Sequence, residues 1–406
     1  MENIMEPNSN NTANQMKQIY LDYAAATPVD ARVLSAMQPY FTEKFYNPSA
    51  SYLPAKHIRE EYEARKAVLA NSIGAKSPDL VITAGATESI NLAFTVLRNF
   101  QSAHCLILET EHAAVRESAK NLSSDYEKIK VDRSGLIDLG DLKSKIKDNT
   151  VLVSVALANN ELGAIQPLSD ISRILQEVRD QRLKTKNLTP IYLHSDASQA
   201  MNLIDLSVAR LGVDLLTINA AKVYGPKGIG ALYVARGIKL SPITFGGGQE
   251  MGLRSGTENV PNLVGFSVAS ELAKKHLVSS RKQYQALAKT FREIIEQKSK
   301  ITPLWLGNPK HQLANFIPVC FDGLDAERLI FKLEDRGIYV STGAACAASK
   351  GQKSHVLSAI GLSDSEIAGS LRITLGKDTT LDDTKIAADN LAEVVNLEAR
   401  RLKLID

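Results

Sequence analysis

The sequence is poor in cysteine and has no long apolar run. Its 406 residues include three cysteines, Cys105, Cys320 and Cys346, too few and too scattered for a disulfide framework. No apolar run approaches the roughly 20 residues that cross a bilayer. The first 17 residues are rich in Asn and contain no Arg, unlike a secretory signal or a transit peptide. We therefore expect a cytoplasmic protein without a membrane partner, and a disordered tail over residues 1–17.

Charge and composition narrow the partners further. A net charge of +3 is too small to make nucleic acid the main partner. No His/Cys cluster has the spacing of metal ligands, so we expect no metal site. With 44% hydrophobic and 23% charged residues, the chain has the composition of an ordinary globular protein, and it is long enough for two domains.

Apolar runs of strand length alternate with longer amphipathic segments through the first two thirds of the chain. The predicted strands are Leu80–Thr83, Cys105–Leu108, Val151–Val155, Ile191–His194 and Asp214–Ile218. The predicted helices are Ile58–Ile73, Ser89–Asn99, Leu168–Gln181 and a stretch directly after Gln199. This alternation predicts an α/β fold, in which helices cover both faces of a mainly parallel sheet.

The pattern changes after the glycines at 246–248. A helical stretch from about Asn262 to Ile295 leads into strands with fewer helices between them, and Lys385–Leu402 reads as a closing helix. We predict a large domain over residues 18–275, whose N-terminal segment to about residue 30 packs on the smaller part. A smaller α+β domain over residues 276–406 carries Cys346.

Polar residues follow the predicted strands, at the edge where parallel sheets bind ligands. They are Thr87, His112, Asn160, Asp196 and Lys222. A lysine such as Lys222 can form a Schiff base with an aldehyde. An acid such as Asp196 can pair with a protonated ring nitrogen, as pyridoxal phosphate chemistry requires. The pattern favours a pyridoxal phosphate enzyme.

The run Gly85-Ala-Thr-Glu-Ser89 follows a strand and opens a helix. Backbone N–H groups at Ala86 and Thr87 therefore suit a phosphate, although a plain helix cap explains the run as well. His112 has the alternative of an ordinary hydrogen-bonding residue, and Asn160 that of a turn residue.

Cys346 differs from the other two cysteines because small residues surround it. Cys105 and Cys320 lie in apolar, strand-like runs, so we predict that both are buried. Cys346 follows Gly343-Ala-Ala and precedes a segment with two lysines, which favours a reactive thiol. Arg372 lies on a strand-like run and needs a carboxylate partner, either a substrate or an acid of the protein itself.

These segments together resemble the class V aminotransferase superfamily, and specifically the cysteine desulfurases of the NifS/IscS type. The resemblance runs from Ile19 almost to the C-terminus. Its segments include Gly85-Ala-Thr-Glu-Ser89, Thr110-Glu-His112, Asn159-Asn-Glu161, Asp196-Ala-Ser-Gln199, Lys222-Val-Tyr-Gly-Pro-Lys-Gly228, Arg254-Ser-Gly-Thr257 and Gly343-Ala-Ala-Cys346. It implies fold type I of the pyridoxal phosphate enzymes, with a seven-stranded sheet in the large domain.

The resemblance also implies roles at the cofactor. Lys222 holds pyridoxal phosphate and moves protons, and His112 stacks on the ring and acts in proton transfer. Asp196 pairs with the ring nitrogen. The remaining cofactor contacts are at Ala86, Thr87, Asn160, Gln199, Asn219 and Thr257, the last donated by the second subunit of a homodimer.

For the substrate, the resemblance implies that Asn160 and Arg372 hold the carboxylate of L-cysteine. Cys346 attacks the substrate sulfur, so that the products are L-alanine and a persulfide on Cys346. The loop resembles the longer loop of the group I enzymes, which reaches acceptor proteins in iron–sulfur cluster assembly or tRNA thiolation.

Three departures from the family pattern stand out. Desulfurases of this type usually read Ser-x-His-Lys at the cofactor lysine, where this chain has Asn219, Ala220, Ala221 and Lys222. Tyr52 replaces a common histidine, and the Cys346 loop continues Ala-Ala-Ser-Lys350. We expect weaker cofactor retention. The alternatives are a selenocysteine lyase or another pyridoxal phosphate lyase, and a non-catalytic partner in sulfur transfer.

Overall fold

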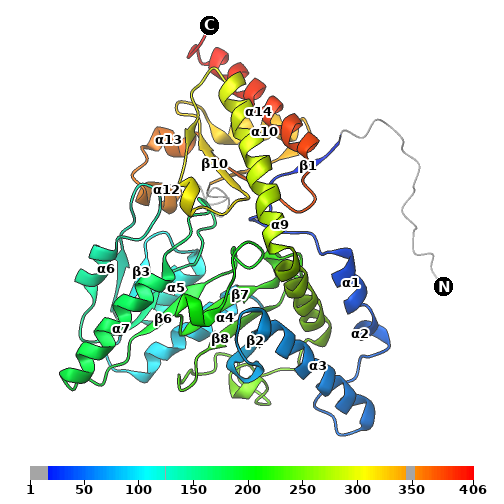
Figure 1. Ribbon diagram of the computed structural model, residues 1–406, viewed down its shortest axis with the longest axis vertical. Coiled ribbons are helices and arrows are strands. Elements are labelled where there is room, and N and C mark those ends of the chain that lie inside the picture. Colours follow the sequence, from blue (N-terminus) through cyan, green and yellow to red (C-terminus); the bar gives the residue numbers. More distant parts are fainter. Residues whose placement is uncertain (1–16, 124, 344–352) are drawn as a thin grey trace.

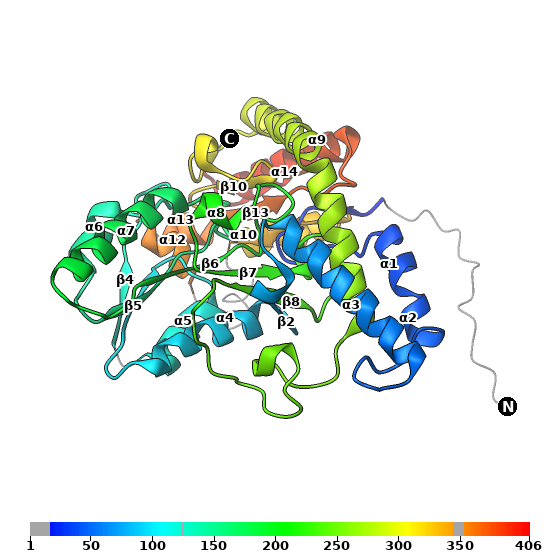
Figure 2. The same cartoon turned by 60° about the horizontal axis from the view of Figure 1, so that its bottom comes forward.

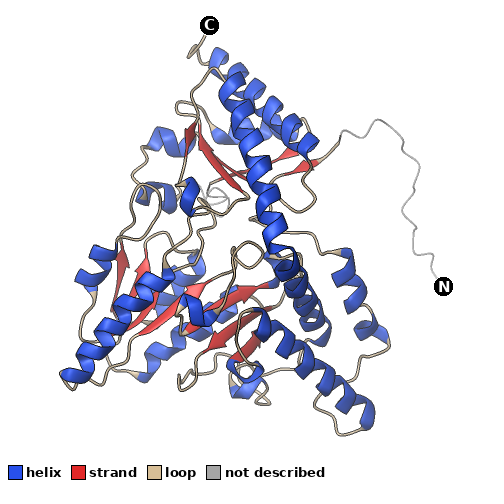
Figure 3. Ribbon diagram, viewed as in Figure 1, coloured by secondary structure: helices blue, strands red, loops and turns tan. Residues whose placement is uncertain are grey.

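The computed structural model describes residues 17–123, 125–343 and 353–406 (Figure 1). Cys346 lies outside these residues. Helices surround the sheets, and the largest sheet lies in the lower half of the view in Figure 3. Across the described residues, we find no helix with the length and apolarity needed to cross a bilayer.

The largest described sheet contains seven strands. Their order is β2 (Leu80–Thr83), β8 (Gly230–Val234), β7 (Leu215–Asn219), β6 (Tyr192–Asp196), β5 (Thr150–Ser154), β3 (His104–Leu108) and β4 (Asp125–Ile129). Strand β8 is antiparallel to both neighbours, and the other adjacent pairs are parallel. The carboxyl ends of every strand except β8 therefore share one edge. The predicted mainly parallel sheet is confirmed.

Alternating side chains along the strands supply two apolar layers. In β2, Leu80 and Ile82 belong to one buried cluster and Val81 to the other, as the two-residue period of a strand requires. Helices α4 (Ala86–Phe94) and α5 (Ala113–Leu122) pack on the face of Val81. The opposite face packs against α3 (Leu53–Ser72), α7 (Leu168–Lys184) and α9 (Val260–Lys298). Figure 2 shows α4 and α5 below the sheet and α7 and α9 above it.

Shorter elements complete this part of the chain. The α-helices are α1 (Ala31–Met37), α2 (Pro39–Thr42), α6 (Leu139–Lys145) and α8 (Val208–Leu211). The 3-10 helices are η1 (Ser77–Asp79), η2 (Thr95–Asn99), η3 (Ala220–Lys222), η4 (Glu250–Gly252) and, later in the chain, η5 (Pro309–His311).

The C-terminal part contains a four-stranded antiparallel sheet. Its order is β12 (Ser341–Thr342), β13 (Ser370–Thr374), β10 (Phe316–Cys320) and β9 (Leu304–Trp305). The helices here are α10 (Ala326–Glu334), α12 (His355–Ala359), α13 (Asp364–Ala368) and α14 (Leu381–Arg401). Strand β1 (Ile19–Tyr20) pairs in parallel with β11 (Ile338–Tyr339). The predicted domain boundary at 275/276 falls inside α9, and the domain limits stay a prediction.

The five predicted strands are confirmed to within two residues at each end. The helix predicted directly after Gln199 is wrong, because turns run through 198–203 and α8 begins only at Val208. Side chains compete with helical hydrogen bonds here. Gln199 Nε2 donates to Ala24 O at 3.0 Å, and Asp205 Oδ1 accepts from Ser207 N at 3.1 Å. The predicted burial of Cys105 and Cys320 is confirmed.

Candidate active site

The shared edge of the large sheet collects the residues that the sequence singled out. Thr87 follows β2, His112 follows β3 and Asn160 follows β5. Asp196 ends β6, and Lys222 follows β7 in η3. These residues are far apart in the sequence, and the parallel strand order brings them to one rim.

Lys222 is held under the N-terminal segment 22–27. Its Nζ donates to Ala25 O. Thr27 fastens the same turn twice, because its hydroxyl donates to Ala221 O at 3.1 Å and accepts from Tyr224 N at 2.9 Å. Asn219 Oδ1 caps η3 by accepting from Ala221 N at 3.2 Å. The segment 22–27 is therefore a wall of the site that the chemistry of the motifs did not predict.

The start of α4 follows β2, and the Lys222 turn follows β7. Only one strand, β8, lies between β2 and β7, so the two features are near each other along the edge of the sheet. Gly85, the residue before α4, has φ 149°, a conformation that favours glycine. Gly230 on β8 passes so close that a Cβ there would lie 2.7 Å from the carbonyl carbon of Gly85. Ala86 and Thr87 form the first turn of α4, and Thr87 is exposed. The helix therefore begins three residues earlier than the predicted Ser89.

Asp196 and Gln199 lie at the centre of the rim. Asp196 Oδ1 accepts from Ser198 N at 2.9 Å, which orients the carboxylate at the end of β6. Gln199 contacts the segment 22–27 through Ala24, as described above. Both side chains are half-buried.

His112 is the N-cap of α5. Its Nδ1 accepts from Ala114 N at 3.1 Å, so in the neutral ring the proton lies on Nε2. Two further contacts hold its loop: Asn159 Nδ2 donates to Thr110 O at 3.0 Å, and His355 Nε2 lies 2.9 Å from Glu111 O. Burial, with the charge of Arg116 adding to it, lowers the pKa of His355 to about 4.

Glu111 is a fully buried acid beside this loop, and the sequence analysis missed it. Its Oε1 accepts from Ala156 N at 2.6 Å, and its Oε2 has no partner among the described residues. Burial raises the pKa of Glu111 well above its ordinary value, and the nearby Asp196 raises it further. The flanking Thr110 and His112 belong to a quoted motif, which was the available signal.

Arg372 and Asn160 meet at the boundary between the two sheets. Arg372, on β13, is 4% exposed. Its Nη2 lies 2.7 Å from Asp22 Oδ1, and its Nη1 donates to Asn160 O at 3.1 Å. The predicted alternative of an acid within the protein is therefore what the structure contains. Arg372 Nε is buried and has no partner within the described part of the chain.

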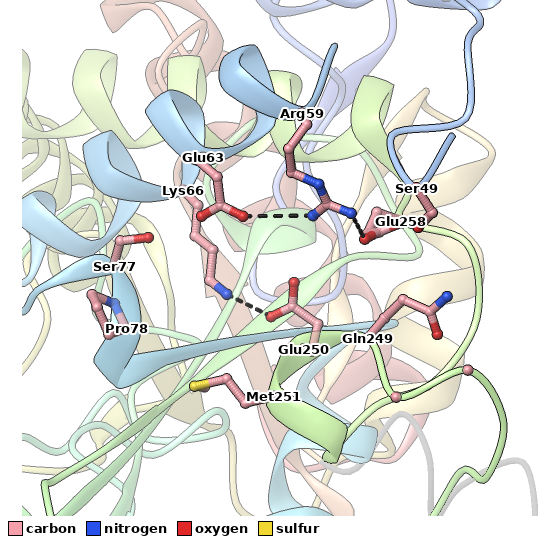
Figure 4. Close-up of a pocket in the computed structure, with 12 residues that line it drawn as sticks. Ser49, Arg59, Glu63, Lys66, Ser77, Pro78, Gln249, Glu250, Met251 and Glu258 are labelled. Carbon is pink, nitrogen blue, oxygen red and sulfur yellow. Dashed lines mark hydrogen bonds and ion pairs between the residues drawn. The ribbon is translucent and has the colours of Figure 1, made fainter. Parts of the chain in front are cut away.

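Thr257 is exposed on the loop between η4 and α9. Arg254 on this loop lies 3.3 Å from Glu88 of α4. A cavity of about 480 Å³ lies beside it (Figure 4), where Arg59, Glu63 and Lys66 of α3 face Gln249, Glu250 and Glu258. Lys66 Nζ lies 2.8 Å from Glu250 Oε2, and Tyr62 also donates to Glu250.

Comparison with known proteins agrees with this architecture. Residues 19–386 match the family model described as aminotransferase class-V. Cysteine desulfurase IscS 1 of Archaeoglobus fulgidus is 40% identical over 391 residues, which cover 95% of this chain and 97% of that protein.

Two solved structures show the same fold. A NifS-like protein superposes with a TM-score of 0.85 at 31% identity and covers 94% of this chain and 100% of its own. The structure described as SspA in complex with cysteine has a TM-score of 0.76 at 34% identity, over 88% of this chain and 99% of its own. The fold is fold type I of the pyridoxal phosphate enzymes. The chain belongs to the aminotransferase class-V family and, within it, to the cysteine desulfurases of the NifS/IscS type.

Proposed function

We propose that this chain is a cysteine desulfurase that uses pyridoxal 5'-phosphate to convert L-cysteine into L-alanine and a persulfide on Cys346. The observation that carries the proposal is that Lys222, Asp196, His112 and the start of α4 all lie at the same edge of the large sheet. The near full-length similarity to cysteine desulfurases supports the same reaction.

The groups on this rim fit the cofactor. The backbone N–H groups that open α4 and the Thr87 hydroxyl are donors that suit a phosphate. Gly230 has no side chain, which allows β8 to pack closely against Gly85 just before these donors. Lys222 would bond the aldehyde, Asp196 would keep the ring nitrogen protonated, and Asn160 and Gln199 would border the ring. When bound, pyridoxal phosphate supplies an electron sink for the bonds at the substrate's α-carbon.

The chain's own groups would do the rest. Arg372 Nε has no partner among the described residues, and with Asn160 this arginine would hold the substrate carboxylate. Lys222 and His112 would transfer protons, and in the neutral ring His112 carries its proton on Nε2. The Cys346 thiolate would bond to the substrate sulfur while the carbon–sulfur bond breaks, and the carbon would take a proton to give alanine. The persulfide sulfur would then pass to an acceptor protein in the cytoplasm.

We propose a homodimer in which Thr257 reaches the phosphate of the partner subunit's site. Thr257 is exposed on its own subunit. Phe245 and Met251 on the same stretch of chain, residues 245–257, are 82% and 56% exposed, so a partner subunit that covered them would remove apolar surface from water. Figure 2 shows this stretch of chain, between β8 and α9, projecting beneath the sheet and away from the C-terminal part.

The decisive test is the absorbance spectrum of the purified protein before and after L-cysteine, with alanine and sulfide assayed together. We expect a visible band that shifts, both products, and no turnover by Cys346→Ser. A visible band without sulfide would contradict L-cysteine as the substrate. Turnover by Cys346→Ser would contradict the attack of the Cys346 thiolate on the substrate sulfur. No band after added pyridoxal phosphate would favour a non-catalytic partner.

Ala221→His tests the altered phosphate site. Because a hydrogen bond to a charged group contributes about 1.5–3 kcal/mol, restoring one would raise cofactor affinity by about tenfold or more. Titration of the apoprotein with pyridoxal phosphate, followed by fluorescence, measures this affinity. Equal affinity in both proteins would show that this position does not reach the phosphate.

A further inference from the structure

The guanidinium of Arg372, the proposed partner of the substrate carboxylate, is closed off in this structure. Its Nη2 pairs with Asp22 Oδ1 at 2.7 Å, and its Nη1 donates to Asn160 O at 3.1 Å. Its Nε is buried, and the whole side chain is only 5% exposed. A carboxylate that enters from solvent can therefore pair with Arg372 only if one of these contacts gives way.

The contact with Asp22 is the one that can give way. Asn160 O belongs to the backbone of the loop after β5, so only a backbone movement would withdraw it. Asp22 contributes a side-chain carboxylate, which is 16% exposed and has the same chemistry as the incoming group. Rotation of this one side chain would exchange one carboxylate for another. The buried guanidinium would stay paired throughout, as a buried charge requires.

The backbone around Asp22 is anchored independently of the ion pair. Thr374 of β13 holds it twice, because Thr374 N donates to Leu21 O at 2.7 Å and the Thr374 hydroxyl accepts from Ala24 N at 3.0 Å. These bonds do not involve the Asp22 carboxylate. The side chain of Asp22 can therefore leave Arg372 while the backbone on either side of it stays in place.

A second acid near Arg372 does not offer the same exchange. Glu161 is 6% exposed, and its Oε2 accepts from Ser354 Oγ at 2.6 Å. Burial raises the pKa of Glu161 to about 7, against the opposing effects of Ser354 and Arg372. Among the described residues, the acid that pairs directly with Arg372 is therefore Asp22.

We propose that Asp22 occupies the carboxylate position of Arg372 until a substrate arrives, and that the substrate carboxylate then takes its place. This role rests on the proposed function, in which Arg372 binds the substrate. Asp22 acts through Arg372 and is a positioning residue. A ligand that must wait for an open site loses affinity in proportion to the fraction of protein that is open. If the pair is closed nine times in ten, the loss is about tenfold.

The test is the melting temperature of the purified protein, loaded with pyridoxal phosphate, as sodium propionate is added at constant ionic strength. Propionamide has a similar shape and no charge, and it is the ligand control. The variants are Asp22→Asn and the double mutant Asp22→Asn with Arg372→Gln. Asp214→Asn is the matched control, because Asp214 is 21% exposed and pairs with Arg179 at 2.6 Å. It lies before β7, at the opposite edge of the sheet from the candidate site.

We expect both single variants to melt at a lower temperature, because each leaves an arginine without its carboxylate. Propionate should restore only Asp22→Asn, with an affinity about tenfold higher than for the wild type. The double mutant lacks the guanidinium and should not respond. In turnover assays, the KM for L-cysteine should fall by a similar factor in Asp22→Asn, while kcat stays within about twofold.

Two results would overturn the proposal. One is equal propionate affinity in the wild type and in Asp22→Asn. The other is an unchanged or raised KM for L-cysteine in a folded Asp22→Asn protein. If this variant does not fold, a crystal structure of the wild type with propionate decides the matter. Propionate on Arg372 Nη2 supports the exchange, and an intact Asp22 pair overturns it.

Propionate binding does not depend on turnover, so the two proposals fail separately. If the wild-type protein forms no alanine, the proposed function fails, while the propionate series still decides the role of Asp22.

Discussion

Glu250 and Glu161 are both shielded acids, and their surroundings differ. Glu250 joins α3 to the loop before α9: its carboxylate meets Lys66 at 2.8 Å, Ile82 N at 2.8 Å and the Tyr62 hydroxyl at 2.5 Å. Glu161, at the edge of the large sheet, receives the Ser354 hydroxyl, while the cation Arg372 is occupied by Asp22.

The difference separates Glu250, a carboxylate that stabilises the fold as an ion, from Glu161, a carboxyl whose pKa is raised by burial. A buried carboxylate with a direct cation and several donors is stable as an ion, and it fastens the elements around it. A buried carboxyl without a direct cation holds its proton up to a higher pH, as the pKa of about 7 for Glu161 indicates. Glu111, fully buried and without an ion pair among the described residues, belongs with Glu161. The two acids whose pKa values burial raises border the candidate site, whereas Glu250 lines the cavity of Figure 4.

Removing the Glu250 carboxylate should have the largest effect on the free energy of unfolding. Glu250→Gln leaves Lys66 buried, with a side chain only 7% exposed, and without a carboxylate. We expect the free energy of unfolding to fall by about 3–5 kcal/mol, measured by urea denaturation. The matched control is Glu293→Gln, whose partner Lys289 is 77% exposed and which should cost less than about 1 kcal/mol. Equal losses in the two variants would remove the distinction.

Removing the titration of Glu161 should have a smaller, pH-dependent effect. Its folded pKa of about 7 exceeds the ordinary 4.5, so the folded state binds the proton more tightly than the unfolded state. Stability from this group is therefore present below pH 4.5 and is lost as the pH rises through 7. Relative to wild type, Glu161→Gln should gain up to about 3 kcal/mol between pH 5 and pH 8. Parallel stability curves for the two proteins would contradict this.

Glu111→Gln should have the smallest effect at pH 7. Burial raises the pKa of the Glu111 carboxyl well above its ordinary value and so favours the neutral form, and an amide of similar shape keeps the acceptor for Ala156 N. We expect a change in the free energy of unfolding within about 1 kcal/mol. A loss as large as that of Glu250→Gln, in the same urea experiment, would mean that Glu111 is ionised and paired.

The strands were predictable because each is an apolar run between polar turns. The helix after Gln199 was not, since its failure depends on Gln199 reaching Ala24, a residue 175 positions earlier in the chain. Lys222, His112 and Asp196 were recognisable because their side chains have distinctive chemistry. Asp22, Glu111 and Glu161 were passed over, because acids of ordinary appearance gain meaning only from burial and from the groups they meet.

The sequence alone determined the α/β class, the strand positions, the buried state of Cys105 and Cys320 and the family, because these follow from local periodicity and ordered motifs. The tertiary structure decided which residues share the rim, that Asp22 occupies Arg372, and that Glu161 lies between Gly343 and Ser354. Those features depend on contacts between distant segments and on the exclusion of water from a carboxyl. Neither the contacts between distant segments nor the burial of a carboxyl can be read from any single position of the chain.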